Sequence, residues 1–432
     1  MSAESRRSGR RDFLKTLTAA TVAAPYVITS NALGATGVAP ASDRITTALI
    51  GSGGRGQQII AGGDQVVAVC DVDAKHAERT KQKIDAASDT MGCMIYSDFR
   101  GVLARDDIDA VVVATPDHWH TLIAAAAIKA GKAVYVEKPL SLTIREGRIL
   151  ADIAQRYGAI VQVGSQQRSD VKFHRACELV RNGRIGELKT VRVEIPTRPG
   201  DGNKPWTPQA VPPELDYDTW LGPAPLAPYH PDRCHYKFRF VTDYSGGDVT
   251  NWGAHQLDIA QWGIGADDSG PVEVEGHGKR NQDGLHDVFY DIHVDFTYAS
   301  GVKIELRSGG NGVTFVGTEG SIFVSRSKLE ADPASILTSR IGPDEIHLAR
   351  GGPENEGGTH MGIWLDCIRA RNSKALNVPV ETGHRSATVC HLANIIMGLD
   401  RKVQWDPAAE QFVDDDEANH MTWRPMRAPW TF

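Results

Sequence analysis

Short apolar runs alternate with amphipathic segments through the first third of the chain. The segments between the apolar runs, such as 121–131 and 143–158, have helical spacing, and the second of them ends at Gly158, a residue type that often caps helices. Strands that alternate with helices predict a parallel, doubly wound sheet. The predicted strands lie within 45–50, 65–73, 108–116, 132–139 and 159–164.

The pattern changes after about Val171. A helix within 172–183 and a strand within 188–196 precede a loop from Thr197 to Asp232 that is rich in Pro, Gly and Trp, as binding loops often are. Period-two runs then predict an antiparallel sheet, and two helices close the chain. The runs lie at 272–280, 289–299, 302–309 and 312–325, and the helices at 360–371 and 385–399.

Length, charge and cysteine spacing narrow the class of protein. A chain of 432 residues favours two domains, and a formal net charge of −7 argues against a basic groove for nucleic acid. None of the six cysteines forms a CxxC pair, so neither a zinc site nor a redox dithiol is indicated. His118 and His120 have the spacing of a metal pair, but no acidic or cysteine set accompanies them, and we expect no metal.

The N-terminus resembles a twin-arginine export signal. Gly9–Lys15 reads GRRDFLK, and a mildly apolar run follows from Thr16 to Ala24. A disordered basic tail is the alternative. We expect residues 1–42 to be signal and linker, with the translocation machinery as a partner. The protein would then be periplasmic or otherwise extracytoplasmic, or membrane-anchored if the signal stays uncleaved.

A glycine-rich turn joins the first predicted strand to a helix and fits GxGxxG. Such a turn lets a pyrophosphate approach the backbone at the helix N-terminus. Asp71 ends the second strand, where a carboxylate binds ribose hydroxyls and repels a 2′-phosphate, so NAD is favoured over NADP. A surface glycine turn with a capping Asp is the alternative. The turn consists of Gly51, Ser52, Gly53, Gly54, Arg55 and Gly56.

Two more polar segments follow strand ends, at the edge of the sheet where ligands bind. Lys138 could donate to a sugar hydroxyl or to the cofactor ribose, and its charge would favour alkoxide character as hydride leaves carbon. Thr115 and Asp117 could instead be simple helix caps. The residues expected at the cofactor are Thr115, Pro116, Asp117, His120, Glu137 and Lys138.

Several ordered motifs together resemble the Gfo/Idh/MocA oxidoreductases. They are GSGGRG, ATPDHWH, AGKAVYVEKPLS, GGDVTNWGAHQLD and FVGTEGSIFV, and they span about 45–325. The resemblance implies an NAD-binding Rossmann domain at 43–165 and a C-terminal α/β domain at 166–432, with an open, mostly antiparallel sheet. It also implies that the substrate lies between the domains and that the open sheet face forms a homo-oligomer, a dimer or tetramer.

The family pattern places GG, Asp, His and Asp at fixed spacing, and the segment after Ser245 matches it except for one acid. The match implies that His255 is the acid–base partner of Lys138 and takes the hydroxyl proton. Asn251 stands where the family has Asp; it can orient a hydroxyl but cannot act as a base. On a helix, Asn251 and His255 would share one face, and Asp258 could hold the His255 ring.

Other polar residues are softer candidates for sugar binding, since each could equally lie in a solvated loop or cap a helix. Trp252 and Trp262 are expected to pack rather than bind sugar. The candidates are Gln166, Gln167 and Arg168 after the last Rossmann strand, Tyr236, Arg239 and Asp243 before the glycine pair, and His384 and Arg385 in a late helix.

These features predict an exported NAD-dependent oxidoreductase acting on a hydroxyl or keto group of a sugar, polyol or glycoside. Because free NAD is not expected to be replenished outside the cytoplasm, the cofactor should be tightly bound. One alternative is a redox-neutral glycoside-cleaving enzyme that works through a transient 3-keto sugar. A second is a non-catalytic sugar-binding protein on the same fold.

Overall fold

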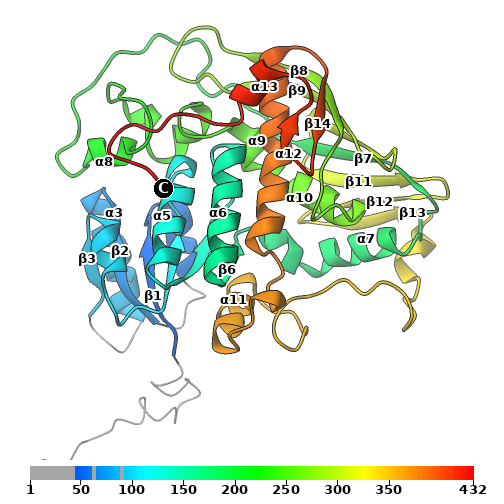
Figure 1. The fold of residues 1–432 in the computed structure, drawn as a ribbon, viewed down its shortest axis with the longest axis horizontal. Coiled ribbons are helices and arrows are strands. Elements are labelled where there is room, and N and C mark those ends of the chain that lie inside the picture. Colours follow the sequence, from blue (N-terminus) through cyan, green and yellow to red (C-terminus); the bar gives the residue numbers. More distant parts are fainter. Residues whose placement is uncertain (1–43, 61–64, 88–91) are drawn as a thin grey trace, which may run out of the picture. The chain divides into compact units, whose positions relative to one another are not determined.

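Parallel strands form the first sheet, whose order within the described residues is β3-β2-β1-β4-β5-β6 (Figure 1). This computed structural model describes residues 44–60, 65–87 and 92–432. The strand order reverses between β1 and β4, and in such sheets the ligand crevice lies at that point. The strands are β1 (Thr46–Ile50), β2 (Gln65–Cys70), β3 (Met94–Tyr96), β4 (Ala110–Val113), β5 (Ala133–Val136) and β6 (Val161–Val163).

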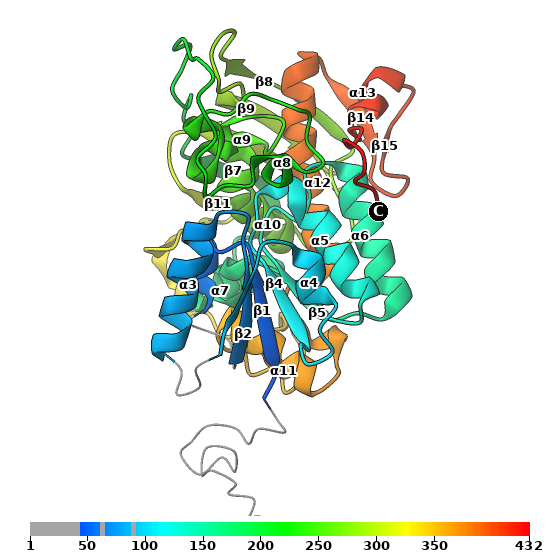
Figure 2. The ribbon, with the colours of Figure 1, turned by 90° about the vertical axis from the view of Figure 1, so that its left-hand side faces the viewer.

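Helices cover both faces of this sheet, which explains its continuous apolar strands. In β1, Ala48 and Ile50 pack toward one face, against residues of α4 (Phe99–Leu103), α5 (Asp117–Lys129) and α6 (Ile144–Tyr157). Leu49 packs toward the other face, against α2 (Gly54–Ile59) and α11 (His360–Arg369). Figure 2 shows α4, α5 and α6 together on one side of the strands.

The second sheet is mixed and mostly antiparallel, as predicted, with the order β13-β12-β11-β7-β10-β9-β8-β14-β15 among the described residues. Strands β7 and β10 pair in parallel, and the other neighbours pair antiparallel. The strands are β7 (Leu188–Ile195), β8 (Glu273–Arg280), β9 (Phe289–Thr297), β10 (Lys303–Ser308), β11 (Gly312–Gly317), β12 (Ser321–Val324), β13 (Leu329–Asp332), β14 (Val403–Asp406) and β15 (Gln411–Phe412).

One face of this second sheet packs on helices and the other is open. Along β7, Val191 and Val193 are buried, whereas Arg192 and Glu194 between and after them are exposed. The covering helices are α7 (Val171–Arg181), α10 (Gly253–Ile264) and α12 (Val380–Leu399), and they share the core of this half (Figure 1). The α/β fold class is therefore confirmed.

The segment that carries His255 is two helices rather than one. Helix α9 (Gly247–Asn251) ends before Trp252, and α10 begins at Gly253. His255 N–H donates to the carbonyl of Trp252 at 3.0 Å, so the carbonyl of Asn251 is left for another donor. The expectation that Asn251 and His255 share one continuous helix face is therefore wrong, because the helix breaks between them.

Segments from the end of the chain return to the first sheet. Trp364 of α11 is buried against it, and Trp430 packs on Trp119 of α5 with ring centroids 4.7 Å apart. Residues 45–432 form one compact unit, and the boundary at 165/166 stays a prediction. No helix in the described ranges is long and apolar enough to cross a membrane. The predicted export signal lies outside the described residues.

Candidate active site

A cavity of about 600 Å³ lies at the carboxyl edge of the first sheet and takes residues from both halves of the molecule. Most of the residues singled out from the sequence line it. These are Gly51, Gly53, Gly54, Arg55, Asp71, Thr115, Pro116, Asp117, His120, Glu137, Lys138, Gln166, Tyr236, Arg239, Asn251 and His255.

The glycine turn is shaped to admit a dinucleotide. Gly51 has φ +88°, and a Cβ there would lie 2.6 Å from the backbone of Ala114, while a Cβ on Gly56 would lie 2.2 Å from the carbonyl oxygen of Gly51. Added Cβ atoms on Gly53 and Gly54 would instead meet nothing within 4 Å. The outer two glycines therefore allow the tight turn, and the inner two leave space at the helix start, as a pyrophosphate needs.

Asp71 lies beside this turn and is held by it. Its Oδ2 accepts the backbone N–H of Ser52 at 2.7 Å and the Ser52 hydroxyl at 2.9 Å, and its Oδ1 accepts the N–H of Asp73 at 2.9 Å. Oδ1 keeps a lone pair for a ribose hydroxyl, whereas both lone pairs of Oδ2 are taken by Ser52. Ser52 and Gly56 do not line the cavity, and Ser52 acts by orienting the carboxylate.

The segment after β4 closes the other side of the turn. The side chain of Asp117 is buried, which raises the pKa of its carboxyl, and it accepts the Ser245 hydroxyl at 2.6 Å. Both ring nitrogens of His120 lie at backbone carbonyls, Pro139 at 2.7 Å and Thr115 at 2.8 Å. His120 therefore ties the ends of β4 and β5 together. The His118 ring lies instead at the carbonyl of Trp220, 3.0 Å away.

Arg55 links the glycine turn to the end of β5. Its Nε donates to Glu137 Oε1 at 2.9 Å, and its Nη2 donates to Gln166. Gly164 makes room for this contact, since a Cβ there would lie 2.8 Å from Glu137 Oε1. The Arg55 charge is thus neutralised inside the cavity.

Lys138 binds the carbonyl oxygen of Asn251, which the break between α9 and α10 leaves without a helical donor. Its Nζ donates to the backbone oxygen and to Oδ1 of Asn251, both at 3.0 Å. Neither acceptor is charged, and no carboxylate forms an ion pair with Lys138 among the described residues. Burial, helped by Arg239 and Arg55 and opposed by Glu137 and Asp117, lowers the pKa of Lys138 to about 8. The pKa of this lysine therefore lies close to neutral pH, as is common at functional sites.

His255 lines the same cavity with its imidazole unbonded. Its Nδ1 is buried without a hydrogen-bond partner in the part of the chain that the structure describes. Burial lowers the pKa of His255 well below its usual range, and the charges of Lys138, Arg326 and Arg55 act in the same direction. The ring is thus held neutral, as a group that must accept a proton requires.

Arg168 and Asp258 form a separate, buried ion pair. Asp258 accepts two bonds from the Arg168 guanidinium at 2.9 Å and the Ser386 hydroxyl at 2.6 Å, and Arg168 also pairs with Asp267 at 2.7 Å. Neither Arg168 nor Asp258 lines the cavity. This placement corrects the expectation that they bind substrate and that Asp258 holds His255: their hydrogen-bonding groups are already used, and they position α10 instead.

Of the other candidates for sugar binding, some line the cavity and some do not. Tyr236 and Arg239 line the cavity, with the Arg239 Cζ 4.8 Å from the centroid of the Tyr236 ring. His384 pairs with Glu410 at 2.8 Å, away from the cavity. The remaining candidates that do not line it are Gln167, Asp243 and Arg385.

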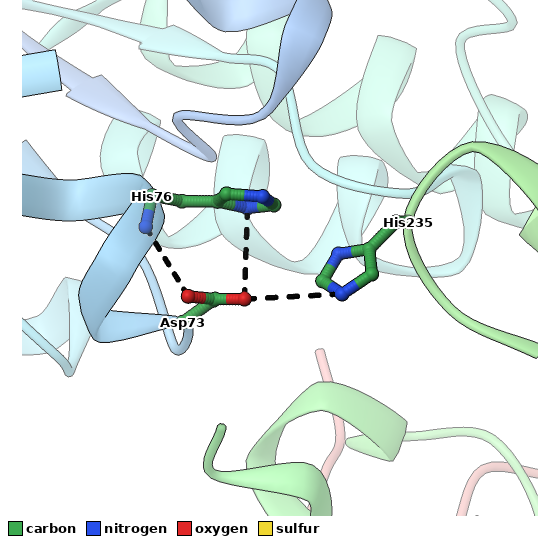
Figure 3. A group of neighbouring side chains, drawn as sticks. All are labelled: Asp73, His76 and His235. Atoms are coloured by element: carbon green, nitrogen blue, oxygen red, sulfur yellow. Dashed lines mark hydrogen bonds and ion pairs between the residues drawn. The ribbon is translucent and has the colours of Figure 1, made fainter. Parts of the chain in front are cut away.

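Asp73, His76 and His235 cluster at the end of the cavity beside Asp71, where this fold would hold the adenosine of NAD, and this is the adenosine end of the cavity (Figure 3). Asp73 Oδ2 is 4.0 Å from His76 Nδ1 and 3.8 Å from His235 Nε2, and Oδ1 accepts the His76 N–H at 3.2 Å. Their donor atoms all lie within 4.8 Å of one another. Within the described ranges this is the only group of three or more His, Cys, Asp or Glu side chains that could hold a metal ion. It joins the β2–α3 turn (α3, Ala74–Ala87) to the loop segment of His235.

Sequence reasoning missed two residues at the opposite end. Trp252, expected to pack, lines the cavity, and Arg326 after β12 stacks on it with Cζ 5.1 Å from the ring centroid. Trp262 does pack, beneath the guanidinium of Arg168. The sequence carried a weak signal for Trp252, which follows Asn251 directly, but none for Arg326.

Two models of one protein family match the chain. Residues 45–165 match the family model described as the Gfo/Idh/MocA oxidoreductase family, NAD-binding Rossmann fold. Residues 200–432, more than half of the chain, match the model for the C-terminal alpha/beta domain of the same family. The chain belongs to the Gfo/Idh/MocA oxidoreductase family. Residues 45–165 thus form an NAD-binding Rossmann fold, and the glycine turn and Asp71 fit that cofactor.

Relatives within the family include two differently named kinds of protein. An inositol 2-dehydrogenase of Pseudomonas savastanoi pv. phaseolicola (strain 1448A / Race 6) is 33% identical over 146 residues, covering 32% of this chain and 42% of its own length. A glycosyl hydrolase family 109 protein 2 of Shewanella sp. (strain ANA-3) is 32% identical over 204 residues, covering 41% and 44%. The chain thus spans less than half the length of these relatives.

A solved structure extends the likeness of fold over most of the chain. Levoglucosan dehydrogenase, in complex with NADH and levoglucosan, superposes with a TM-score of 0.58 at 18% identity, covering 83% of this chain and 99% of its own. At this identity the likeness concerns the fold.

Proposed function

We propose that this protein is an exported NAD-dependent oxidoreductase that oxidises or reduces a CH–OH group of a sugar, polyol or glycoside. The observation that carries the proposal is the placement of Lys138 and His255 in one cavity with the glycine turn and Asp71. Inositol 2-dehydrogenase and levoglucosan dehydrogenase, the names of two similar proteins, indicate the same substrate class.

The chain's own residues divide the work at the reacting hydroxyl. A bound nicotinamide would accept or return a hydride at the substrate carbon. Lys138, held at Asn251, donates a hydrogen bond to the hydroxyl oxygen and stabilises negative charge on it. His255 is neutral and lines the cavity, so its imidazole accepts the hydroxyl proton during oxidation and returns it during reduction.

The test is nucleotide content followed by turnover. Protein purified without added cofactor is denatured, and the released nucleotide is identified by mass spectrometry. A panel of sugars, polyols and aryl glycosides is then screened for reduction of the nicotinamide. We expect NAD and at least one oxidised substrate. Tight sugar binding with no turnover would favour a non-catalytic sugar-binding protein instead.

Export and tight cofactor binding are part of the proposal. A cofactor that stays bound for about an hour needs an off-rate near 10⁻⁴ per second, hence a dissociation constant of roughly 10⁻¹⁰ M at an ordinary on-rate. Replacing Arg10 and Arg11 of the signal with lysine should keep the protein in the cytoplasm, which cell fractionation measures. Wild-type protein found only in the cytoplasm would refute export.

Redox-neutral cleavage of a glycoside is the second candidate, because a relative is named as a glycosyl hydrolase family 109 protein. The same Lys138 and His255 would then act on a transient 3-keto sugar whose acidified neighbouring hydrogen permits elimination. Release of a phenol from an aryl glycoside without net reduction of nucleotide distinguishes the two. Net reduction in step with sugar consumption would exclude cleavage.

We also propose a homo-oligomer, a dimer or tetramer, formed through the open face of the second sheet. That face carries ion pairs such as Arg307–Asp295 at 2.6 Å on neighbouring strands. Light scattering of the purified protein measures the mass. A monomer at micromolar concentration would refute it.

A further inference from the structure

Arg326 presents a fixed and largely unused guanidinium to the cavity. It stacks on Trp252 at 5.1 Å, and its Nε donates to Gln167 Oε1 at 3.1 Å. Within the described residues its two terminal nitrogens have no hydrogen-bond partner and no carboxylate within ion-pair distance. Two contacts thus hold the group, and the two outer nitrogens form a fork matched to a carboxylate or phosphate.

The charges at this end of the cavity are mostly positive. Lys138, Arg239 and Arg326 line it, and in the described part of the chain none of them pairs with a carboxylate. Arg55 is neutralised by Glu137 at 2.9 Å, and Asp117 is buried and accepts the Ser245 hydroxyl. Asp71 and Asp73 lie at the adenosine end.

This excess of cations acts on the site itself. Arg326 contributes to the lowered pKa of His255, and Arg239 to that of Lys138, after the effect of burial. Desolvation and the nearby Arg55 also lower the pKa of Arg326, and they outweigh the opposite effects of Asp170 and Glu137. Like charges at close range raise the free energy of the empty site, and a bound anion would relieve that repulsion.

We propose that Arg326, fixed on Trp252 and Gln167, is the subsite for an anionic group on the carbohydrate, a carboxylate or a phosphate, with Arg239 adding to the attraction. The substrate class is therefore an acidic sugar, such as a hexuronate or a sugar phosphate. This proposal rests on the proposed oxidoreductase function. Arg326 binds and orients the substrate and does not take part in proton transfer.

Matched sugars test the proposal. Hexoses, the corresponding hexuronates and hexose 6-phosphates of the same configuration are compared as substrates by kcat/KM. The variants are Arg326→Gln, Arg326→Lys and, as a control at an exposed position of α6 that does not line the cavity, Arg156→Gln. We expect wild type to prefer an anionic sugar, and Arg326→Gln to lower the ratio of anionic to neutral kcat/KM by about 10–100-fold. Arg326→Lys should retain part of the preference, and Arg156→Gln all of it.

Each other outcome decides a separate point. Preference for phosphates over hexuronates identifies the anion as a phosphate. Turnover of neutral sugars with no anionic preference, or a ratio unchanged in Arg326→Gln, overturns the subsite and leaves the oxidoreductase function standing. A loss of NAD affinity in Arg326→Gln equal to the loss in kcat/KM would assign Arg326 to the cofactor and also overturn the proposal.

If no sugar reduces the nucleotide, the oxidoreductase function fails, and calorimetry still tests the subsite. Glucuronate, glucose 6-phosphate and glucose are then titrated into wild type and Arg326→Gln holding their native cofactor. Binding of either anionic sugar that is tighter than that of glucose and is lost in Arg326→Gln supports the subsite. Binding of neither anionic sugar more tightly than glucose overturns it.

Discussion

Two buried polar clusters meet helix α10 three residues apart, and they differ in how well their hydrogen bonds are satisfied. At Asp258, the Arg168 guanidinium, Ser386 and Asp267 use nearly every donor and acceptor. At His255, the imidazole Nδ1 has no hydrogen-bond partner among the described residues, and Lys138 donates only to neutral oxygens. A buried polar cluster whose hydrogen bonds are satisfied stabilises a fold, whereas buried polar groups without partners are available to bind and react with a ligand.

Lys138 and His255 form the reactive cluster, and replacing Lys138 should have the largest effect on activity. Lys138→Met removes the donor that holds the hydroxyl, and kcat should fall by about 10²–10⁴-fold. Because the variant also removes a buried charge without a carboxylate partner, its midpoint of thermal unfolding should stay level or rise. Steady-state kinetics and thermal melts measure the two. A full retention of kcat would remove Lys138 from the mechanism.

Replacing Arg168, in the structural cluster around Asp258, should lower stability rather than activity. Arg168→Met leaves Asp258 buried without its counter-charge, and the free energy of unfolding should fall by about 3–5 kcal/mol. The double variant Arg168→Met with Asp258→Leu removes the unpaired charge, so it should recover part of that loss. Urea denaturation measures both. If Arg168→Met loses turnover while keeping its stability, Arg168 belongs to the reactive cluster.

Local sequence predicts those parts of the site that strand ends position. Gly51, Asp71 and Lys138 each follow a strand, and because parallel strands end at one edge of a sheet, the pattern of strands is enough to predict that these residues converge. Arg168 and Asp258 were assigned to substrate because sequence shows polarity but not the partner that satisfies it. Arg326 lies outside any motif, and only its stacking on Trp252, which is distant in the sequence, indicates that it belongs to the cavity.

The two clusters should also respond differently to pH. Burial lowers the pKa of Lys138 to about 8, so the cationic donor, and with it kcat, should be lost above about pH 8. His255 stays neutral at pH 6.5 and above, so the acid limb should lie below that value. A pH profile of kcat tests both limbs. An alkaline limb that is unchanged in Lys138→Arg would belong to another group.

Stability should change with pH in the opposite direction. Between about pH 8 and 10.4 the unfolded chain keeps the Lys138 proton that the native state has released, so this group makes the free energy of unfolding rise with pH. The difference between wild type and Lys138→Met isolates that contribution. A difference that does not depend on pH in this range would contradict the lowered pKa.

Asn251→Asp should sharpen the comparison by giving the reactive cluster an acid. A carboxylate 3.0 Å from Lys138 Nζ would raise the pKa of the lysine and move the alkaline limb of kcat upward by roughly one unit. Asn251→Ser is the matched control without charge. If the limb moves equally in both variants, geometry rather than charge sets the pKa.

His235→Ala should have the smallest effect, because it touches neither cluster and loosens only the adenosine end. The ring lies 3.8 Å from Asp73 and is partly exposed, and burial together with His76 lowers the pKa of His235, so the ion pair is weak at neutral pH. We expect the release rate of NAD to rise by about 2–5-fold with kcat unchanged, measured by stopped-flow displacement. The difference should grow as the pH is lowered and His235 becomes charged. If the difference in NAD release rate instead disappears when a chelator is added to wild type, Asp73, His76 and His235 hold a metal ion. The contact between His235 and Asp73 is then stronger than an exposed ion pair.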